Sequence, residues 1–138
     1  MNSYRILEGE HSSGFHFKPL FFIKELRAKV RFHESCLYNH AAEYGVNKLF
    51  GFSQGLNHMK NSKRWGWTSD GKKILLHLFD HIDGKIFSEE VDWVKPGEWR
   101  ELALTSPKKT AVGYRLYPYF GGILPAPHDM DIDIEWGN

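Results

Sequence analysis

The sequence predicts an all-β protein whose antiparallel strands form a two-layer sandwich, with at most one short helix. Three observations indicate this class. Apolar and polar residues alternate with a period of two through most apolar segments, as in strands with one buried and one solvated face. Glycine and proline divide the chain into segments of strand length. About nine such segments and almost no helical spacing favour a sandwich or barrel, because an isolated sheet would leave an apolar face exposed.

Composition limits the size and the partners of the protein. The 138 residues are predicted to form a single domain, residues 1–138, with 41% hydrophobic and 25% charged residues, as in an ordinary globular protein. The formal net charge is only +1, which provides no domain-wide field for binding nucleic acid. Cys36 is the single cysteine, so the sequence excludes an intrachain disulfide and a thiolate zinc site.

The N-terminal half begins with a short strand candidate at 15–18 and a clear one at 26–33. In the second segment apolar side chains alternate with basic ones, which predicts a half-buried strand. The connection 34–47 contains the only helical candidate, "ESCLYNHAAEYG". The sequence leaves open whether this connection is a lid, an edge cover or an interface. Strands are then predicted at 48–53 and 63–68, with a turn at "SQG" between them and a turn at "SDG" after the second.

The C-terminal half contains the strongest hairpin signal. Asp83-Gly84 divides "KILLHLFDHI" from "KIFSEEV", which predicts a tight turn with Gly84 at positive φ. Further strands are predicted at 99–104 and 111–119, separated by a turn at "TSPKK". A last strand is predicted at 130–136, where apolar and acidic residues alternate.

The order of these segments resembles a known family. "KVRF", "NKLFGFSQG", "NSKRWGW", "SDGKKILLHLFDHIDGK" and "KPGEWRELALT" follow one another over roughly residues 26–136. This order is similar to the concanavalin-like jelly roll of legume-type lectins, laminin-G-like modules and certain polysaccharide-degrading enzymes. The resemblance implies two curved antiparallel sheets, with sugars bound on the concave face or the rim.

Aromatic and polar side chains provide the candidate ligand site. Sugar rings stack on aromatic faces while their hydroxyl groups hydrogen-bond to polar edges. Residues two apart on a strand share a face, so each of three predicted strands presents its own set of such side chains on one face. A polar loop precedes the first of these strands. The candidate ligand-binding residues are Trp65 and Trp67, His77, Phe79 and His81, Tyr117 and Tyr119, with Asn57, His58 and Asn61 in the loop. The alternative for the two tryptophans is a place in the core.

The acidic residues of the last strand allow a catalytic interpretation. The retaining β-glucan hydrolases of this jelly roll have the motif E-x-D-x-E, and "DIDIE" at 131–135 is similar to it. The resemblance implies a nucleophile at Asp131, a supporting carboxylate at Asp133 and an acid/base at Glu135. Because Asp131 stands where the family has Glu, the sequence favours the simpler interpretation that these residues form the solvated face of a strand.

Two groups of residues offer possible metal ligands. Asp129, Asp131 and Asp133 offer the oxygen ligands that calcium prefers, but Ile134 stands where the calcium loop signature has glycine. His77 and His81 share a strand face, yet four strand residues span about 13 Å, too far for one zinc ion. The sequence therefore predicts no cofactor, with calcium as the alternative.

Three functions follow from these features. The first is a small, non-catalytic, lectin-like module whose partner is a glycan. The second is a structural or interaction subunit of a larger assembly, such as a virion, with another protein or a second copy of the chain as partner. The third is a carbohydrate-active enzyme, either a hydrolase or a lyase using His and Tyr. Single-stranded nucleic acid is a more distant partner, through "HMKNSKRWGW".

The N-terminal segment predicts the location of the protein. Its apolar cluster, residues 20–23, is short and is followed by charged residues, so it is neither a signal-peptide core nor a membrane span. The expectation is a soluble protein without membrane contact, in the cytoplasm or within a larger particle.

Overall fold

Eight antiparallel strands form one continuous sheet in the computed structural model, which describes residues 1–41 and 44–137, without the side chains of 107 and 108. The strands are β1 (Asn2–Ile6), β2 (Pro19–Phe32), β3 (Asn47–Ser53), β4 (Ser62–Ser69), β5 (Ile74–Ile82), β6 (Lys85–Val94), β7 (Trp99–Leu116) and β8 (Met130–Trp136). Their order in the sheet is β1-β8-β2-β7-β3-β4-β5-β6. The only helical element in the described ranges is the 3-10 turn η1 (Glu34–Cys36). The all-β prediction is therefore confirmed.

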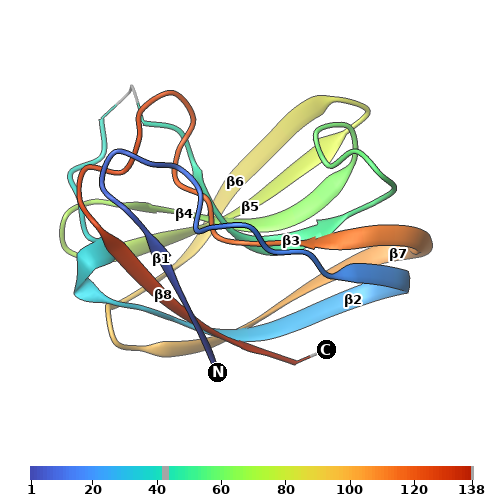
Figure 1. Ribbon diagram of the computed structural model, residues 1–138, viewed down its shortest axis with the longest axis horizontal. Helices are drawn as coiled ribbons and strands as arrows, with labels where there is room; N and C mark the ends of the chain where they lie inside the picture. Colours follow the sequence, from blue (N-terminus) through green and yellow to red (C-terminus); the bar gives the residue numbers. More distant parts are fainter. Residues whose placement is uncertain (42–43, 138) are drawn as a thin grey trace.

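The sheet folds over on itself, so that two layers face one another (Figure 1). One layer contains β1, β8, β2 and most of β7, and the other contains β3 to β6. β7 joins them, since it pairs with β2 along most of its length and with β3 at Gly51↔Leu116. Strand pairing is thus continuous through β7, whereas the sequence analysis predicted two separate sheets. The core between the layers includes Phe32, Phe50, Phe52, Trp67, Leu76, Ile132 and Ile134, all with no exposed surface.

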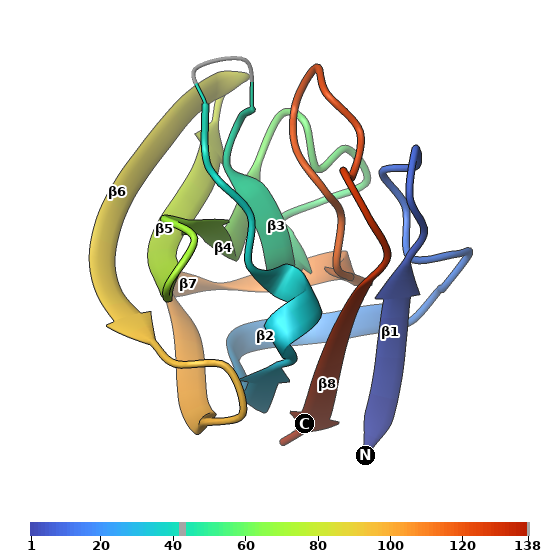
Figure 2. The same ribbon diagram turned by 90° about the vertical axis from the view of Figure 1, so that its left-hand side faces the viewer.

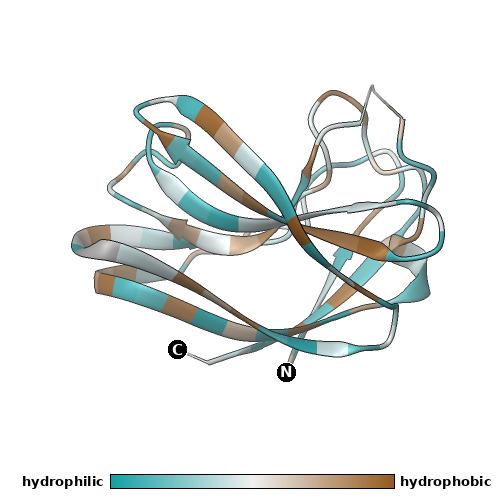
Figure 3. Ribbon diagram, turned by 180° about the vertical axis from the view of Figure 1, so that it is seen from behind, coloured by the Kyte–Doolittle hydropathy of each residue, from teal (hydrophilic) through white to brown (hydrophobic). Residues whose placement is uncertain are grey.

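Alternation of apolar and polar residues explains why these segments are strands (Figure 3). In β2, Leu26, Ala28, Val30 and Phe32 are buried, while the basic residues between them face outward. Burying four such side chains contributes several kcal/mol to stability, at about 25 cal/mol per Å² of apolar surface. The strand predicted at 26–33 is confirmed. The prediction at 15–18 is wrong, because this segment forms no strand; the neighbouring strands are β1 and β2.

A predicted turn lies inside a single long strand. The segments 99–104 and 111–119 were expected to be separate strands, but β7 continues through "TSPKK". The reason is a bulge: Thr110 pairs with Ile23 and Thr105 with Glu25, so β7 has more residues here than β2. A proline is tolerated at such a point, because the ladder of hydrogen bonds is already interrupted there.

The β5–β6 hairpin and the connection 34–47 were the other local features predicted from the sequence. The β5–β6 hairpin turns at Asp83 (φ 50°) and Gly84 (φ +81°), so the predicted turn is confirmed. In the connection 34–47, where "ESCLYNHAAEYG" was predicted to be able to hold a helical turn or two, the described residues contain the 3-10 turn η1; residues 42–43 lie outside the described ranges. Its Cys36 and Tyr38 are buried and close one end of the core. The described residues contain no helix with the length and apolar character that a membrane span requires.

Candidate functional site

The outer face of β3–β6, turned away from β2 and β7, carries the candidate site, which we call the outer groove. Register decides which side chains reach it. Arg64 pairs with Phe79 and Gly66 with His77 across β4 and β5, and paired residues share a face. The alternate residue Trp65 points the other way, since its indole Nε1 donates to the Ala103 carbonyl oxygen of β7, 3.0 Å away.

Connecting loops border this face. The connections before β3 and after β7 lie side by side above β3 (Figure 2). Their contact is fixed by Asn47, whose Oδ1 accepts a hydrogen bond from the Gly121 backbone N at 2.6 Å and whose Nδ2 donates to the Tyr38 hydroxyl. A backbone bridge between Lys48 and Tyr119 adds the "YFGG" segment to the edge of β3. The groove therefore has walls as well as a floor.

Three hollows make up the outer groove, and two of them share lining residues. The His77 pocket, of about 540 Å³, is lined by Asn39, His40, Tyr44, Gly45, Val46, Thr68, Ser69, Asp70, Leu75, His77 and Glu90. The Arg64 pocket, of about 320 Å³, is lined by Lys48, His58, Met59, Arg64, Phe79, His81, Ile86, Tyr119, Gly121 and Gly122. The Tyr117 pocket, of about 470 Å³, shares His58, Arg64 and Tyr119 with the Arg64 pocket and adds Tyr114 and Tyr117.

Two glycines shape the floor of the groove. A Cβ at Gly51 would collide with the Lys63 carbonyl oxygen and lie 2.6 Å from Arg64 Cγ. A Cβ at Gly66 would lie 2.7 Å from both the Asn47 carbonyl oxygen and Val46 Cγ1. Since no larger residue fits, these glycines let the Arg64 side chain lie against β3 and let the chain before β3 approach β4.

The Arg64 pocket holds two cations without a carboxylate partner. Arg64 is 7% exposed; its Nη2 lies 3.3 Å from His81 Nδ1, and its Nε has no hydrogen-bond partner. Lys48 Nζ donates to the Gly121 carbonyl oxygen at 3.2 Å and lies 4.6 Å from the centre of the Phe79 ring. The Arg64 guanidinium lies 5.4 Å from the same ring. Among the described lining residues of this pocket there is no Asp or Glu.

Burial of these cations shifts their titration. Burial, with a smaller effect of Arg64, lowers the pKa of Lys48 to about 8. Burial lowers the pKa of Arg64 to about 10. The pKa values of His58 and His81 are also lowered, first by burial and then by the charge of Arg64. The two imidazoles are thus neutral near pH 7, while Arg64 and most of Lys48 are charged.

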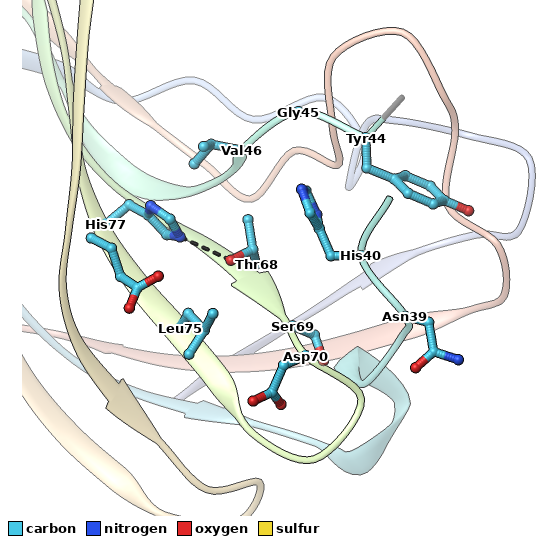
Figure 4. Close-up of a pocket in the computed structure, with 11 residues that line it drawn as sticks. Asn39, His40, Tyr44, Gly45, Val46, Thr68, Ser69, Asp70, Leu75 and His77 are labelled. Carbon is cyan, nitrogen blue, oxygen red and sulfur yellow. Dashed lines mark hydrogen bonds between the residues drawn. The ribbon is translucent and has the colours of Figure 1, made fainter. Parts of the chain in front are cut away.

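The His77 pocket has the opposite character (Figure 4). His77 Nε2 lies 2.8 Å from Thr68 Oγ1. Burial lowers the pKa of His77, and the nearby Glu90 acts in the opposite direction. In Figure 4, Thr68 lies between His77 and His40, and Asp70 lies below them, next to Ser69. Two carboxylates, Asp70 and Glu90, therefore line this end of the groove.

The predicted ligand-binding residues are divided by the fold. His77, Phe79 and His81 lie on the outer groove, together with His58 and Tyr119, and Tyr117 lines the adjoining hollow. Trp67 has no exposed surface and Trp65 faces β7, so both indoles lie on the core side of β4. Asn57 is exposed on the bordering loop, where its Oδ1 accepts a hydrogen bond from the Met59 backbone N. Asn61 Oδ1 accepts from the Asp83 backbone N, which joins this loop to the hairpin.

The acidic residues of β8 lie on the other layer, away from the groove. Asp131 pairs with Arg5. Asp133 is 2% exposed and accepts from Ser3, Arg31 and His33 at 2.7–3.1 Å. Burial alone would raise the pKa of Asp133, but the hydrogen bonds from Arg31, Ser3 and His33 outweigh it and the pKa is lowered.

The remaining acids of this segment are also held apart. Glu135 is exposed, and Asp129 Oδ1 accepts a hydrogen bond from the Glu8 backbone N. In the described ranges, no three His, Cys, Asp or Glu side chains are grouped to hold a metal ion. Each of these acids therefore either bonds to another residue of the chain or faces solvent. This holds for the acids that the resemblance places at catalytic positions and for those considered as calcium ligands.

The sequence analysis missed the two cations of the groove, Lys48 and Arg64. A usable signal was present for Arg64, since it alternates with Trp65 and Trp67 and must take the opposite face. For Lys48 the register is broken by a bulge between Lys48 and Phe50, which alternation alone does not reveal. Comparisons of the chain with protein-family models, with curated proteins and with solved structures found no match.

Proposed function

We propose that the protein is a small, non-catalytic glycan-binding module and that the glycan lies in the outer groove. The observation that carries this proposal is a set of three hollows on one side of the sheet, with an exposed aromatic ring, Tyr119, that lines two of them. Tyr119 is 41% exposed, and its ring stacks on His11 with centres 5.5 Å apart and an interplanar angle of 15°. An aromatic ring that is fixed by stacking on one side and exposed to solvent can stack on the apolar face of a sugar.

Polar groups beside this ring support the same proposal. The His58 imidazole and the Tyr114 hydroxyl are 2.7 Å apart, and both line the Tyr117 pocket. Ser12 and Ser13 line the same hollow. These donors and acceptors match the hydroxyl groups at the edge of a sugar ring. The jelly-roll relationship is part of the proposal, since lectins of that family bind sugars on the concave face of one sheet.

A glycan array followed by titration calorimetry tests the proposal. The wild type should bind at least one glycan class, and Tyr119→Ala should weaken that binding by about tenfold, because a stacked ring contributes about 1.4 kcal/mol. The matched control is Phe87→Ala, which removes a ring that is 53% exposed and lines none of the three hollows. An array without binders, or equal losses in the two variants, would contradict the proposal. Release of reducing ends from a bound glycan would instead indicate an enzyme.

A second candidate function is that of an interaction subunit, and exposed apolar residues favour it. Phe17, Leu56 and Met59 border the hollows and are 67%, 81% and 58% exposed. Phe15 and Ile123, on two of the bordering loops, are 94% and 87% exposed. Apolar side chains gathered in this way mark protein-binding surfaces in other proteins. Sedimentation analysis distinguishes the candidates, because a self-associating subunit gives a mass that rises with concentration, whereas a monomeric lectin-like module does not.

A further inference from the structure

The two cations of the Arg64 pocket differ from the other cations whose partners the structure gives. Arg5, Arg27, Arg31 and Arg100 each pair with a carboxylate, as do Lys63 and Lys73. These pairs all retain some exposure to solvent. Arg64 is more buried than any of them, yet no carboxylate lies within pairing distance of it among the described residues. Arg64, the most buried of the described arginines, therefore has no carboxylate counter-ion among the described residues.

This arrangement is unfavourable in the free protein. A buried charge loses hydration, and only a counter-ion or a full set of hydrogen bonds restores that loss. The contacts present are partial, since one guanidinium nitrogen is unsatisfied and the Phe79 ring faces both cations. The two positive charges also repel each other, which contributes to the lowered pKa of Lys48. An anion entering the pocket would compensate both charges at once.

We propose that the Arg64 pocket binds an oxyanion carried by a sugar ring, as in a uronic acid, with Lys48 and Arg64 as its counter-ions. This inference rests on the glycan-binding function proposed above and specifies the class of glycan. Tyr119, which lines the same pocket, provides the aromatic surface for the ring that carries the anion. Arginine pairs with planar carboxylates through two parallel hydrogen bonds, which fits a sugar carboxylate.

Charge along the groove gives the ligand a direction. The Arg64 pocket holds two cations, whereas Asp70 and Glu90 line the His77 pocket at the other end. A carboxylate is attracted to the first and repelled by Glu90 in the second, whereas the charge of Asp70 is compensated by its ion pair with Lys73. The acidic sugar unit that determines affinity therefore lies at the Arg64 end.

Titration calorimetry with paired probes tests this inference. The probes are tetragalacturonate and its fully methyl-esterified form, which keeps the sugar rings and removes the negative charges. The acid should bind at least about tenfold more tightly than the ester, as expected from one charge-assisted contact. Lys48→Met, which keeps an unbranched side chain without the charge, should abolish this preference, and Lys48→Arg should retain it. The matched control is Lys63→Met, since Lys63 pairs with Asp80 on the opposite face and its loss should leave the preference unchanged.

The outcomes separate the inference from the function on which it rests. Equal binding of acid and ester, unaffected by Lys48→Met, would overturn the anion inference and leave glycan binding standing. Failure of every neutral and acidic glycan to bind would overturn both. An oligosaccharide that carries sulfate esters but no carboxylates, and that binds with the same dependence on Lys48, supports the inference and assigns the oxyanion to a sulfate. Inorganic sulfate binding as tightly as the oligosaccharides would overturn the role of the sugar ring. Thermal melting of each variant verifies that it is folded.

Discussion

Removing the positive charge of Lys48 should stabilise the free protein. The pKa of this lysine falls from the ordinary value of 10.5 to about 8, and each pKa unit corresponds to about 1.4 kcal/mol. The fall gives an upper limit of about 3.4 kcal/mol for the cost of the charge in the folded state. Lys48 is only partly buried and contacts Gly121 and Phe79, so solvent screening and these contacts reduce the net effect. Lys48→Met should therefore raise the free energy of unfolding by about 1 kcal/mol at pH 7.

The sign of the pH dependence provides a second test of the same cause. Near pH 7 the ammonium group is charged in the folded and unfolded states, and the folded state carries the full penalty. Between about pH 8 and pH 10.5 the folded state releases the proton while the unfolded state keeps it, so the wild type becomes relatively more stable. The difference between the wild type and Lys48→Met should therefore shrink over this range. Urea unfolding at pH 7 and at about pH 10 measures both differences.

Two results would refute this reasoning. A variant less stable than the wild type at pH 7 would mean that the contacts of Lys48 with Phe79 and Gly121 outweigh the burial of its charge. A stability difference that does not change with pH would mean that the titration of Lys48 is not its source. Lys63→Met, which removes an ion-paired lysine on the other face, corrects for any general effect of losing one positive charge.

Three further predictions concern the fold. Asp133→Asn should lower the free energy of unfolding by about 1.5–3 kcal/mol, because it weakens hydrogen bonds from charged groups to a buried carboxylate. This difference should begin to shrink as the pH falls below the ordinary carboxyl pKa of 3.8, and it should disappear below the lowered pKa of Asp133, which stabilises only while ionised. Gly84→Val should cost about 1–2 kcal/mol from the positive φ alone, because no atom lies within 4 Å of the added Cβ. Gly51→Ala should cost about 1–3 kcal/mol, because its Cβ meets the backbone of β4.

Each of these predictions has a measurement that would contradict it. In chemical denaturation, Asp133→Asn should have a lower midpoint than Asp131→Asn, since Asp131 pairs only with an exposed arginine. Equal midpoints for those two variants would show that the buried contacts of Asp133 contribute nothing. An unchanged melting temperature for Gly84→Val would mean that the hairpin turn is misassigned. Wild-type stability in Gly51→Ala would mean that β3 and β4 separate without penalty.

Local residue patterns in the sequence predicted much of the secondary structure. They did not predict which strands pair over long distances in the sequence. The strand at 26–33 and the turn at Asp83-Gly84 were both indicated by a few consecutive residues. β1 was missed because its five residues contain only two buried positions, and its partner β8 lies at the other end of the sequence. The break expected at "TSPKK" was wrong because a paired strand with a bulge accommodates the proline.

The candidate site was less predictable than the fold. A period of two places His77 and Phe79 on one face and Trp65 on the other, but it does not say which face meets the core. Composition would assign a face with lysine and arginine to solvent, since such residues are seldom buried. The burial of Arg64 depends on Gly51, which a different strand supplies. That contact is a property of the assembled sheet and has no signal in the local sequence.

The position of β8 has a consequence for how the protein is made. β8 lies between β1 and β2, pairing Tyr4 with Ile132 on one side and Phe32 with the same residue on the other. During synthesis β1 leaves the ribosome before β8, and it has no strand partner until β8 follows, more than one hundred residues later. Pairing between such distant segments forms slowly, and a strand edge left open in the meantime promotes aggregation. Newly made chains should therefore depend on chaperones until β8 is inserted, even though the finished sheet is continuous.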